Sequence, residues 1–262
     1  MIRRLLVGLA FVVVSGCTVT SARPHPTTTH EPTTTRPAIA MRRPTTTHRP
    51  TTTQAPTTTR PPLTTHRQPP PAPTSGPSRG TVWLTFDDGP NPGETQAILE
   101  TLAQYRIHAA FFVVGKRAVR YPGLVAEERA AGMVIGNHTY DHPLTLINMT
   151  REQMAWEIDN GVSSPWFRPP GGFVSPTLRT LVAAKGMQIV LWDIDPQDWS
   201  RPGSDTIAAR VLSHAKPWWR QPSNPDVVVV LHDGGGDRWQ TVRALPRIID
   251  EFRRKGYRFA TL

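Results

Sequence analysis

Two adjacent aspartates, Asp87 and Asp88, close a strand-like run and are followed at once by a Gly-Pro pair. Neighbouring side chains of a strand point to opposite faces, but the turn that Gly and Pro impose here lets both carboxylates face one cleft. Two carboxyl groups this close have different pKa values, because their charges repel, unless a cation binds one of them. The pair therefore indicates either a metal ligand beside a free base or an ordinary surface turn, where Asp, Gly and Pro are also common.

Two histidines, His138 and His142, lie four residues apart just after an apolar stretch. This spacing brings both imidazoles to one side of a single helical turn, which suits a metal clamp. With Asp88 the set becomes two imidazoles and one carboxylate, which leaves positions open for water and substrate. Such a set predicts Zn²⁺, with Co, Mn or Ni as alternative ions of the same kind.

Three further segments carry complementary chemistry. Arg168 begins an Arg-Pro-Pro-Gly-Gly run, and a guanidinium fork can hold a carboxylate in its ionised form. Asp198 and Trp199 offer a carboxylate and an aromatic wall, and His232 ends a buried apolar run, where it is available as a general acid. Each residue also has a structural alternative: Arg168 could form a surface ion pair, Trp199 could lie in the core, and His232 could cap a helix. The occurrence of all these motifs together at strand ends favours catalysis.

Alternating strand and helix patterns from residue 81 onward would position these side chains. The predicted strands are Val82–Phe86, Ala109–Val114, Met133–Gly136, Trp166–Arg168, Met187–Trp192, Val227–Leu231 and Arg258–Thr261. The predicted helices are Glu94–Tyr105, Leu124–Ala131, Arg151–Asp159, Pro176–Lys185, Asp205–His214 and Arg247–Lys255. Repeated βα units imply a parallel sheet in an α/β domain, either an incomplete barrel or an open doubly wound sheet. In both, catalytic residues gather at the carboxyl ends of the strands.

The N-terminus is expected to be an export signal. Two arginines precede a ten-residue apolar core, Leu5–Val14, which is too short to span a bilayer as a helix. The segment ends in Val-Ser-Gly-Cys, which resembles the lipobox of bacterial lipoproteins, and Cys17 is the only cysteine of the chain. We therefore expect residues 1–17 to be a lipoprotein signal peptide whose Cys17 is lipidated and anchors the protein to the outer face of the cell membrane.

Residues 18–80 are rich in Pro, Thr and Arg, and Pro-Thr-Thr-Thr occurs five times in them. Such a segment cannot bury enough apolar surface to fold, so we expect a disordered linker that reaches into the cell wall. Residues 1–80 hold ten arginines against one glutamate, whereas residues 81–262 are almost neutral, with 20 basic and 19 acidic side chains. The positive charge of the chain therefore belongs to the linker and does not indicate a nucleic-acid partner.

Read in order, the motifs resemble those of the NodB-homology polysaccharide deacetylases, carbohydrate esterase family 4, over essentially all of residues 81–262. The resemblance rests on five segments: Thr85–Pro90, His138–His142, Arg168–Gly172, Asp198–Trp199 and Leu231–His232. It implies a distorted (β/α) barrel of about seven parallel strands and a divalent metal.

The resemblance also implies a role for each residue. Asp87 would be the base, oriented by Arg168, and His232 the general acid, partnered by Asp198. The remaining roles fall to the metal ligands Asp88, His138 and His142, to the pocket residues Trp199 and Leu231, and to Gly171, whose N–H would bind the oxyanion. Gly171 departs from the family, which commonly has Tyr there, so a side chain over the groove is missing. The His138–Arg168 segment is also short for the family, which would open that rim of the site.

These observations predict a metal-dependent hydrolase of N-acetyl groups on a cell-wall glycan, with peptidoglycan N-acetylglucosamine as the first substrate. The alternatives are a chitooligosaccharide deacetylase or an O-acetyl xylan esterase. A more distant alternative is a wall-binding module without turnover. No feature requires an oligomer, so we expect a monomer.

Overall fold

The computed structural model describes residues 78–213 and 226–262. The expected signal peptide with Cys17, and all but the end of the expected linker, lie outside the described residues. None of the described helices has the length and apolar character needed to cross a membrane.

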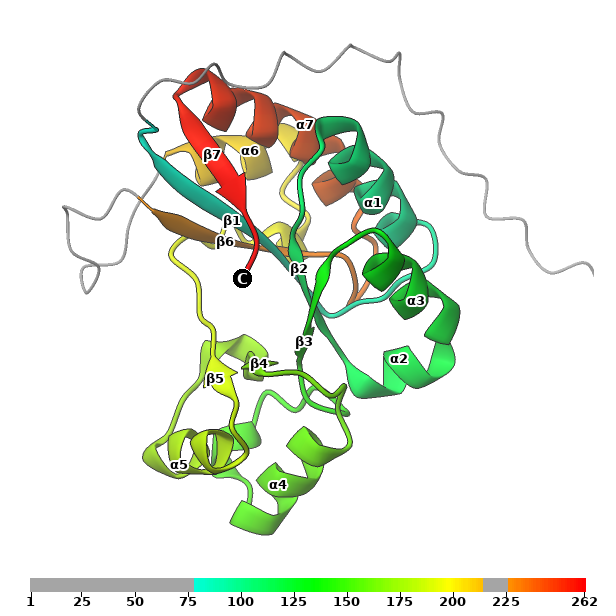
Figure 1. Cartoon of the computed structure of the whole chain (residues 1–262), viewed down its shortest axis with the longest axis vertical. Coiled ribbons are helices and arrows are strands. Elements are labelled where there is room, and N and C mark those ends of the chain that lie inside the picture. The colour runs from blue at the N-terminus through cyan, green and yellow to red at the C-terminus, as the bar shows by residue number, and fades with distance from the viewer. Residues whose placement is uncertain (1–77, 214–225) are drawn as a thin grey trace, which may run out of the picture. The chain divides into compact units, whose positions relative to one another are not determined.

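Seven parallel strands form one curled sheet, as the resemblance predicts (Figure 1). The strands are β1 (Gly80–Asp87), β2 (Ala110–Val113), β3 (Val134–Asn137), β4 (Trp166–Phe167), β5 (Gln188–Ile189), β6 (Val227–His232) and β7 (Tyr257–Ala260). Their order is β5-β4-β3-β2-β1-β6, and β7 pairs with the first half of β1, while β2 pairs with its end. The structure therefore decides for the distorted barrel.

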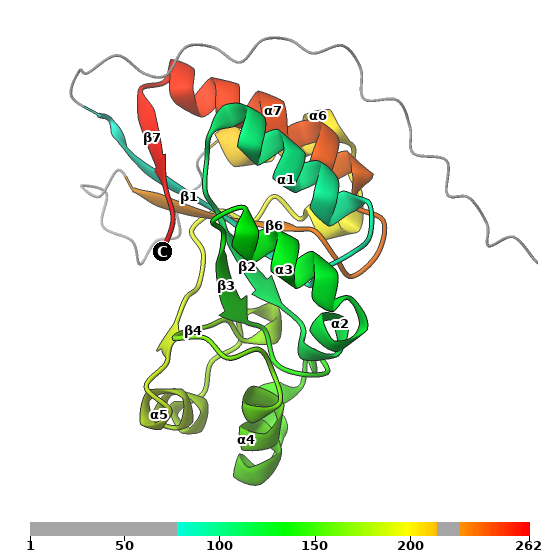
Figure 2. The ribbon, with the colours of Figure 1, turned by 45° about the vertical axis from the view of Figure 1, so that its right-hand side comes forward.

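Helices cover the outer side of the sheet (Figures 1 and 2). They are α1 (Glu94–Tyr105), α2 (Gly115–Arg120), α3 (Pro122–Ala130), α4 (Arg151–Asp159), α5 (Pro176–Ala184), α6 (Ser204–Leu212) and α7 (Trp239–Arg254). The main hydrophobic cluster joins β1 and β6 to α1, α6 and α7, and includes Phe86, Ile98, Ile207, Val229 and Leu245. Val227–Leu231 is apolar throughout because both faces of β6 are covered.

A second, smaller hydrophobic cluster lies under α4 and α5. It consists of Leu146, Met154, Ile158, Phe167, Leu178, Leu181 and Val182. The strands that join the two clusters pair through a single register position, Asn137 of β3 opposite Phe167 of β4. The side chain of Asn137 adds two hydrogen bonds, because its Nδ2 donates to the carbonyls of Ile158 and Val162, each at 2.9 Å.

Two predicted elements, β5 and α7, differ most from their predicted bounds. Strand β5 is only two residues long because the carbonyls of Val190 and Leu191 accept hydrogen bonds from Arg168 instead of extending the sheet. Helix α7 starts at Trp239, eight residues before the predicted start, and continues through Pro246 because its buried face runs unbroken from Val242 onward. Helix α2 was not predicted at all.

Candidate active site

The side chains of the two adjacent aspartates both lie against one imidazole, that of His138. Asp87 is the last residue of β1. Asp88 has a left-handed backbone conformation (φ 72°), which directs its side chain toward the same histidine as that of Asp87. As a result, Nε2 of His138 lies 3.8 Å from a carboxylate oxygen of Asp87 and 3.4 Å from one of Asp88. The surface-turn alternative is therefore wrong, because Asp87 is buried beside the histidines.

Asp88, His138 and His142 form a group whose ligand atoms all lie within 4.8 Å of one another. Nε2 of His142 lies 3.0 Å from Oδ1 of Asp88. The spacing of the two histidines predicted a helical turn, and this prediction was wrong. They lie in a loop with left-handed residues at Thr139 and His142, yet the loop still brings both rings to Asp88.

The loop keeps its shape through hydrogen bonds to its backbone. Oδ1 of Asn137 accepts from the Thr139 N–H at 2.8 Å, and Oγ1 of Thr139 accepts from the His142 N–H at 3.0 Å. Glu157 of α4 reaches in from another element, and its Oε2 accepts from the N–H groups of Tyr140 and Asp141 at 3.0 and 2.9 Å. Asn137 and Glu157 thus position the two histidines without touching the ligand atoms.

The chemistry of the three ligand atoms fits a divalent cation. Nδ1 of His138 lies 2.7 Å from the Arg168 carbonyl, which can only accept, so Nδ1 carries the proton and Nε2 keeps its lone pair. Oδ1 of Asp88 is buried and accepts no hydrogen bond from the described residues. Burial would raise the pKa of Asp88, but the adjacent imidazoles, when protonated, lower it further than burial raises it. The site therefore favours positive charge between these side chains.

The Asp87 carboxylate is held by a buried arginine. Nη1 of Arg168 donates to Oδ1 of Asp87 and to Oγ1 of Thr85, both at 2.7 Å. Nε of Arg168 donates to the Val190 carbonyl at 3.0 Å, and the guanidinium lies 4.0 Å from the ring centre of Phe112. Arg168 is fully buried, so the surface ion pair considered above is excluded. A charge-assisted contact of this kind holds the carboxylate in one orientation.

His232 stands beside Asp87, since the two residues are register partners on β6 and β1. Nδ1 of His232 contacts Oδ1 of Asp198 at 2.7 Å, and Oδ2 of Asp198 accepts from the His232 N–H and from Oγ1 of Thr241. Burial alone would lower the pKa of His232, but Asp198, with help from the charges of Asp87 and Asp88, raises it to about 9. The imidazole is thus protonated at neutral pH.

The predicted pocket residues occupy different environments. Trp199 is half exposed, so it is not the core residue that the sequence allowed as an alternative. Gly171 has a left-handed backbone (φ 66°) in a short turn after Arg168. Leu231 is fully buried in the main cluster, and its contact with an acetyl group stays a prediction.

Known proteins share this arrangement of elements. The sequence profile of the polysaccharide deacetylase family matches residues 74–190. A peptidoglycan-N-acetylglucosamine deacetylase of Bacillus cereus is 40% identical over an alignment of 191 residues, and the match covers 69% of this chain and 85% of the relative. The chain belongs to the polysaccharide deacetylase family.

Two further relatives agree with this assignment. A chitooligosaccharide deacetylase of Sinorhizobium fredii is 35% identical over 204 residues, covering 71% of this chain and 91% of the relative. The solved structure of a family 4 carbohydrate esterase from Streptomyces lividans, in complex with acetate, superposes with a TM-score of 0.61 at 34% identity. That match covers 70% of this chain and 93% of the esterase. The protein is accordingly a hydrolase of the polysaccharide deacetylase class.

Several residues that shape the site of this polysaccharide deacetylase were missed from the sequence. Thr85, Glu157 and Thr241 each bond a predicted site residue or its loop from a distant point of the chain. Of the three, only Thr85 could have been found from the sequence, because it lies within the Thr85–Pro90 motif. Nothing in the sequence marks Glu157 or Thr241.

Two more carboxyl groups are fully buried in the fold. Asp233 follows the general-acid candidate and packs against the Gly89 backbone, and its Oδ2 accepts from Oγ1 of Thr95 at 2.6 Å. Glu128 of α3 accepts no hydrogen bond from the described residues. Burial, and next the charge of Asp233, raises the pKa of Glu128 well above its usual range.

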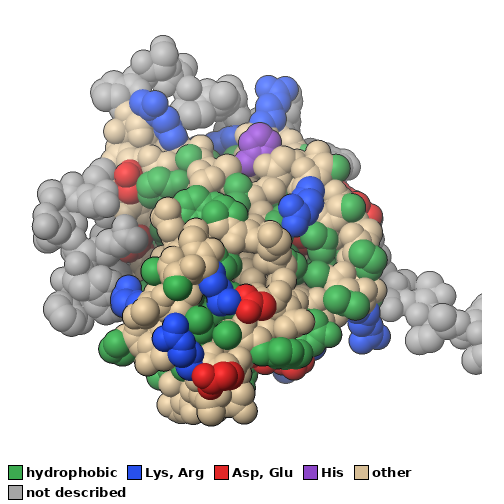
Figure 3. Space-filling view, turned by 60° about the horizontal axis from the view of Figure 1, so that its bottom comes forward, with side chains coloured by type: hydrophobic (Ala, Val, Ile, Leu, Met, Phe, Trp, Pro, Cys, Tyr) green, Lys and Arg blue, Asp and Glu red, His purple; other side chains and the backbone are tan. Residues whose placement is uncertain are grey.

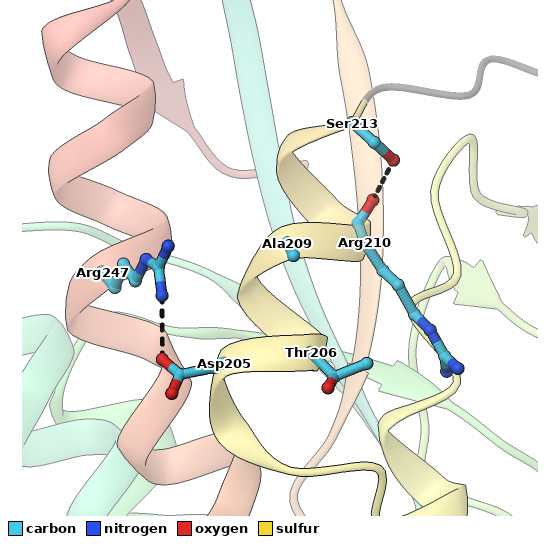
Figure 4. A pocket seen from close by; sticks show the side chains of 6 residues that line it. All are labelled: Asp205, Thr206, Ala209, Arg210, Ser213 and Arg247. Atoms are coloured by element: carbon cyan, nitrogen blue, oxygen red, sulfur yellow. Dashed lines mark hydrogen bonds and ion pairs between the residues drawn. The ribbon is translucent and has the colours of Figure 1, made fainter.

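A hollow of about 530 Å³ lies away from this site, along α6 and the facing side of α7 (Figure 4). It is lined by Asp205, Thr206, Ala209, Arg210, Ser213 and Arg247. Nη1 of Arg247 contacts Oδ1 of Asp205 at 2.8 Å across it. None of the predicted catalytic residues lines this hollow, so we assign it no part in the chemistry.

Proposed function

We propose that this protein removes N-acetyl groups from peptidoglycan N-acetylglucosamine. The observation that carries the proposal is the meeting of three groups at the carboxyl end of the sheet. These are a carboxylate held by a buried arginine, a set of two imidazoles and one carboxylate, and an imidazole protonated at neutral pH. Together they supply a base, a cation site and an acid, which amide hydrolysis requires.

Asp88, His138 and His142 would hold the cation, which we propose to be Zn²⁺, with Co, Mn or Ni as alternatives. Such a cation supplies Lewis-acid chemistry, since it polarises a carbonyl and lowers the pKa of water. Asp87, oriented by Arg168, accepts the proton of the attacking water. The Gly171 N–H donates to the oxyanion, a contact typically worth about 3 kcal/mol. His232, oriented by Asp198, then gives its proton to the leaving nitrogen.

The raised pKa of His232 favours an amide over an ester substrate. An amine leaves a tetrahedral intermediate only after it gains a proton, whereas an alcohol is expelled more readily without one. An imidazole whose pKa is about 9 carries that proton throughout the neutral range. The O-acetyl xylan esterase stays an alternative that the comparison of substrates tests.

The choice of peptidoglycan over chitin oligomers is supported by the relative with 40% identity, named a peptidoglycan-N-acetylglucosamine deacetylase. The relative named a chitooligosaccharide deacetylase is 35% identical and keeps chitin oligomers as the second candidate. The expected lipid anchor at Cys17 and the expected linker agree with a substrate in the wall.

The test is acetate release by the chain from residue 18 onward, in the presence of Zn²⁺. Peptidoglycan, chitin oligomers and acetylated xylan are compared side by side, and we expect the highest kcat/KM on peptidoglycan. Asp87→Asn and His138→Ala should abolish release, while the surface variant Arg247→Ala should retain it. Unchanged release by both site variants would overturn the assignment.

The proposed location has a separate test. We propose that the protein is a monomer anchored at the outer face of the bacterial membrane through a lipid on Cys17. Cys17→Ser should move the protein from the membrane fraction to the soluble fraction without changing its specific activity. A variant that stays in the membrane fraction would show that another segment provides the anchor.

A further inference from the structure

Two large apolar side chains, Leu144 and Phe173, are exposed next to the active site, at 60% and 54% of their surface. They meet over Gly171. A Cβ at position 171 would lie 2.8 Å from Cε2 of Phe173 and 3.5 Å from Cδ2 of Leu144. The ring of Phe173 therefore covers the place where a side chain at position 171 would begin.

The backbone explains this placement. Gly171 and Gly172 are both left-handed, with φ of 66° and 74°, a conformation that L side chains rarely adopt. A Cβ on Gly172 would come within 2.7 Å of the Trp192 ring, so the second glycine lies flat against that ring. The glycine pair thus lets the chain lie close to Trp192 and brings Phe173 back over Gly171.

The same contacts connect this rim to the catalytic groups. The guanidinium of Arg168 lies 5.5 Å from the centre of the Trp192 ring and donates to Asp87. Leu144 follows the ligand candidate His142 by two residues. Two separate segments that each carry a site residue therefore contribute one side chain to the exposed apolar pair.

The form of the rim limits what it can bind. Two exposed apolar side chains offer far less surface than a stable protein interface buries. On the face turned forward in Figure 3, hydrophobic side chains lie among charged ones. The Phe173 ring, backed by Leu144, matches the area of one small ring of a ligand. An aromatic face attracts the apolar C–H face of such a ligand ring. A glycan whose acetamido group reaches Asp87 must continue past the site as neighbouring pyranose rings.

We propose that Phe173, supported by Leu144, is a specificity-determining residue that stacks on a pyranose ring of the glycan substrate. It occupies the space that a side chain at position 171 would otherwise take. This inference rests on the proposed function, because it takes an N-acetylated glycan as the substrate. Beyond that function, it identifies Phe173 as the residue that recognises the sugar chain outside the reacting acetyl group.

The experiment compares Phe173→Ala, Phe173→Tyr and wild type on two substrates. One is a chitin oligomer, which offers neighbouring rings, and the other is para-nitrophenyl acetate, which has no sugar. For Phe173→Ala we expect a KM on the oligomer raised roughly three- to tenfold with kcat retained, and no change on the small ester. Phe173→Tyr should restore the wild-type KM. Val119→Ala, which truncates another exposed apolar side chain, is the matched control.

The outcomes separate the two claims. If wild type releases acetate from the oligomer and Phe173→Ala has an unchanged KM, the stacking role is wrong and the deacetylase function stands. An equal loss on both substrates would mean that Phe173 only supports the fold of the site, which also overturns the role. If wild type releases no acetate from any glycan, the proposed function itself fails.

Discussion

The Nδ1–H of His138 donates a hydrogen bond of 2.7 Å to the backbone carbonyl of Arg168. This bond connects the ligand loop to the turn that carries the arginine partner of Asp87. It also determines which ring nitrogen faces Asp88, because the carbonyl fixes the proton on Nδ1. A backbone atom, which no substitution removes, thus sets the tautomer of a ligand candidate.

The tautomer can be measured directly. In protein loaded with Zn²⁺ and labelled with ¹⁵N-histidine, His138 should show a protonated Nδ1 and an unprotonated Nε2 whose resonance shifts on metal addition. His108, which lies outside the site, serves as the internal reference. A proton found on Nε2 of His138 in the loaded protein would contradict the ligand assignment.

Substitution of Asp87 and of Asp88 should impair the enzyme in different ways. Asp88→Asn removes a charged ligand, so Zn²⁺ affinity measured by calorimetry should fall by more than about tenfold. Asp87→Asn should leave affinity near wild type and lower kcat by about 10²- to 10⁴-fold, because only the base is lost. Equal loss of Zn²⁺ affinity in both variants would show that the two carboxylates share one role.

Thr85 should matter through Arg168. Its hydroxyl accepts from the guanidinium at 2.7 Å and donates to the Val229 carbonyl at 2.8 Å. Thr85→Val keeps the shape but removes the acceptor, so kcat should fall about tenfold or more, with KM retained. Thr85→Ser keeps the hydroxyl and should stay near wild type. If both variants behave alike, the methyl group and not the hydroxyl is what matters.

The pH dependence of kcat should reveal the Asp198–His232 pair. The acid works while His232 is protonated, so wild-type activity should decline as the pH rises through about 9. Asp198→Asn removes the main group that raises this pKa, so the alkaline limb should move toward the ordinary histidine value of about 6.5. Asp205→Asn on the surface of α6 should leave the profile in place. An unmoved limb in Asp198→Asn would exclude His232 as the titrating acid.

Glu128 should make stability fall as the pH rises from about 4.3 toward about 9. Its folded pKa is raised above the unfolded value, so its stabilisation is complete below about 4.3 and is lost as the pH rises toward the folded pKa. Glu128→Gln cannot ionise and should therefore gain stability relative to wild type as the pH rises. We expect this as a higher Tm at pH 8 than wild type, about 2–4 °C for each kcal/mol gained. Glu127→Gln, an exposed neighbour, should show no such trend, and a flat difference for Glu128→Gln would argue against ionisation at this position.

Most catalytic candidates were predictable because they end or directly follow apolar strands, and parallel strands bring their carboxyl ends together. Asp87 and His232 are register partners, so two motifs almost 150 residues apart meet by sheet pairing alone. The fold was predictable for the same reason, since seven apolar runs alternated with helical patterns.

The supporting residues were not predictable, because their partners are backbone groups or distant side chains. Glu157 bonds two backbone N–H groups of the ligand loop, and nothing in the sequence shows where backbone donors will point. The helical turn predicted for His138 and His142 was wrong because spacing alone does not specify a helix. The predicted start of α7 was eight residues too late, since the helix continues through Pro246, where the apolar face that α7 buries outweighs the helix-breaking tendency of proline.

The two hydrophobic clusters have a consequence for how the enzyme loses activity. Arg168 follows β4, whose Phe167 belongs to the smaller cluster, while Asp87 ends the central strand of the larger one. Because one register pair joins β3 to β4, we expect the smaller cluster to open before the main sheet does. Opening would withdraw the guanidinium from the base long before the bulk of the secondary structure melts. We therefore expect that the loss of activity on heating precedes the loss of secondary structure, and that changes which stabilise the smaller cluster delay it.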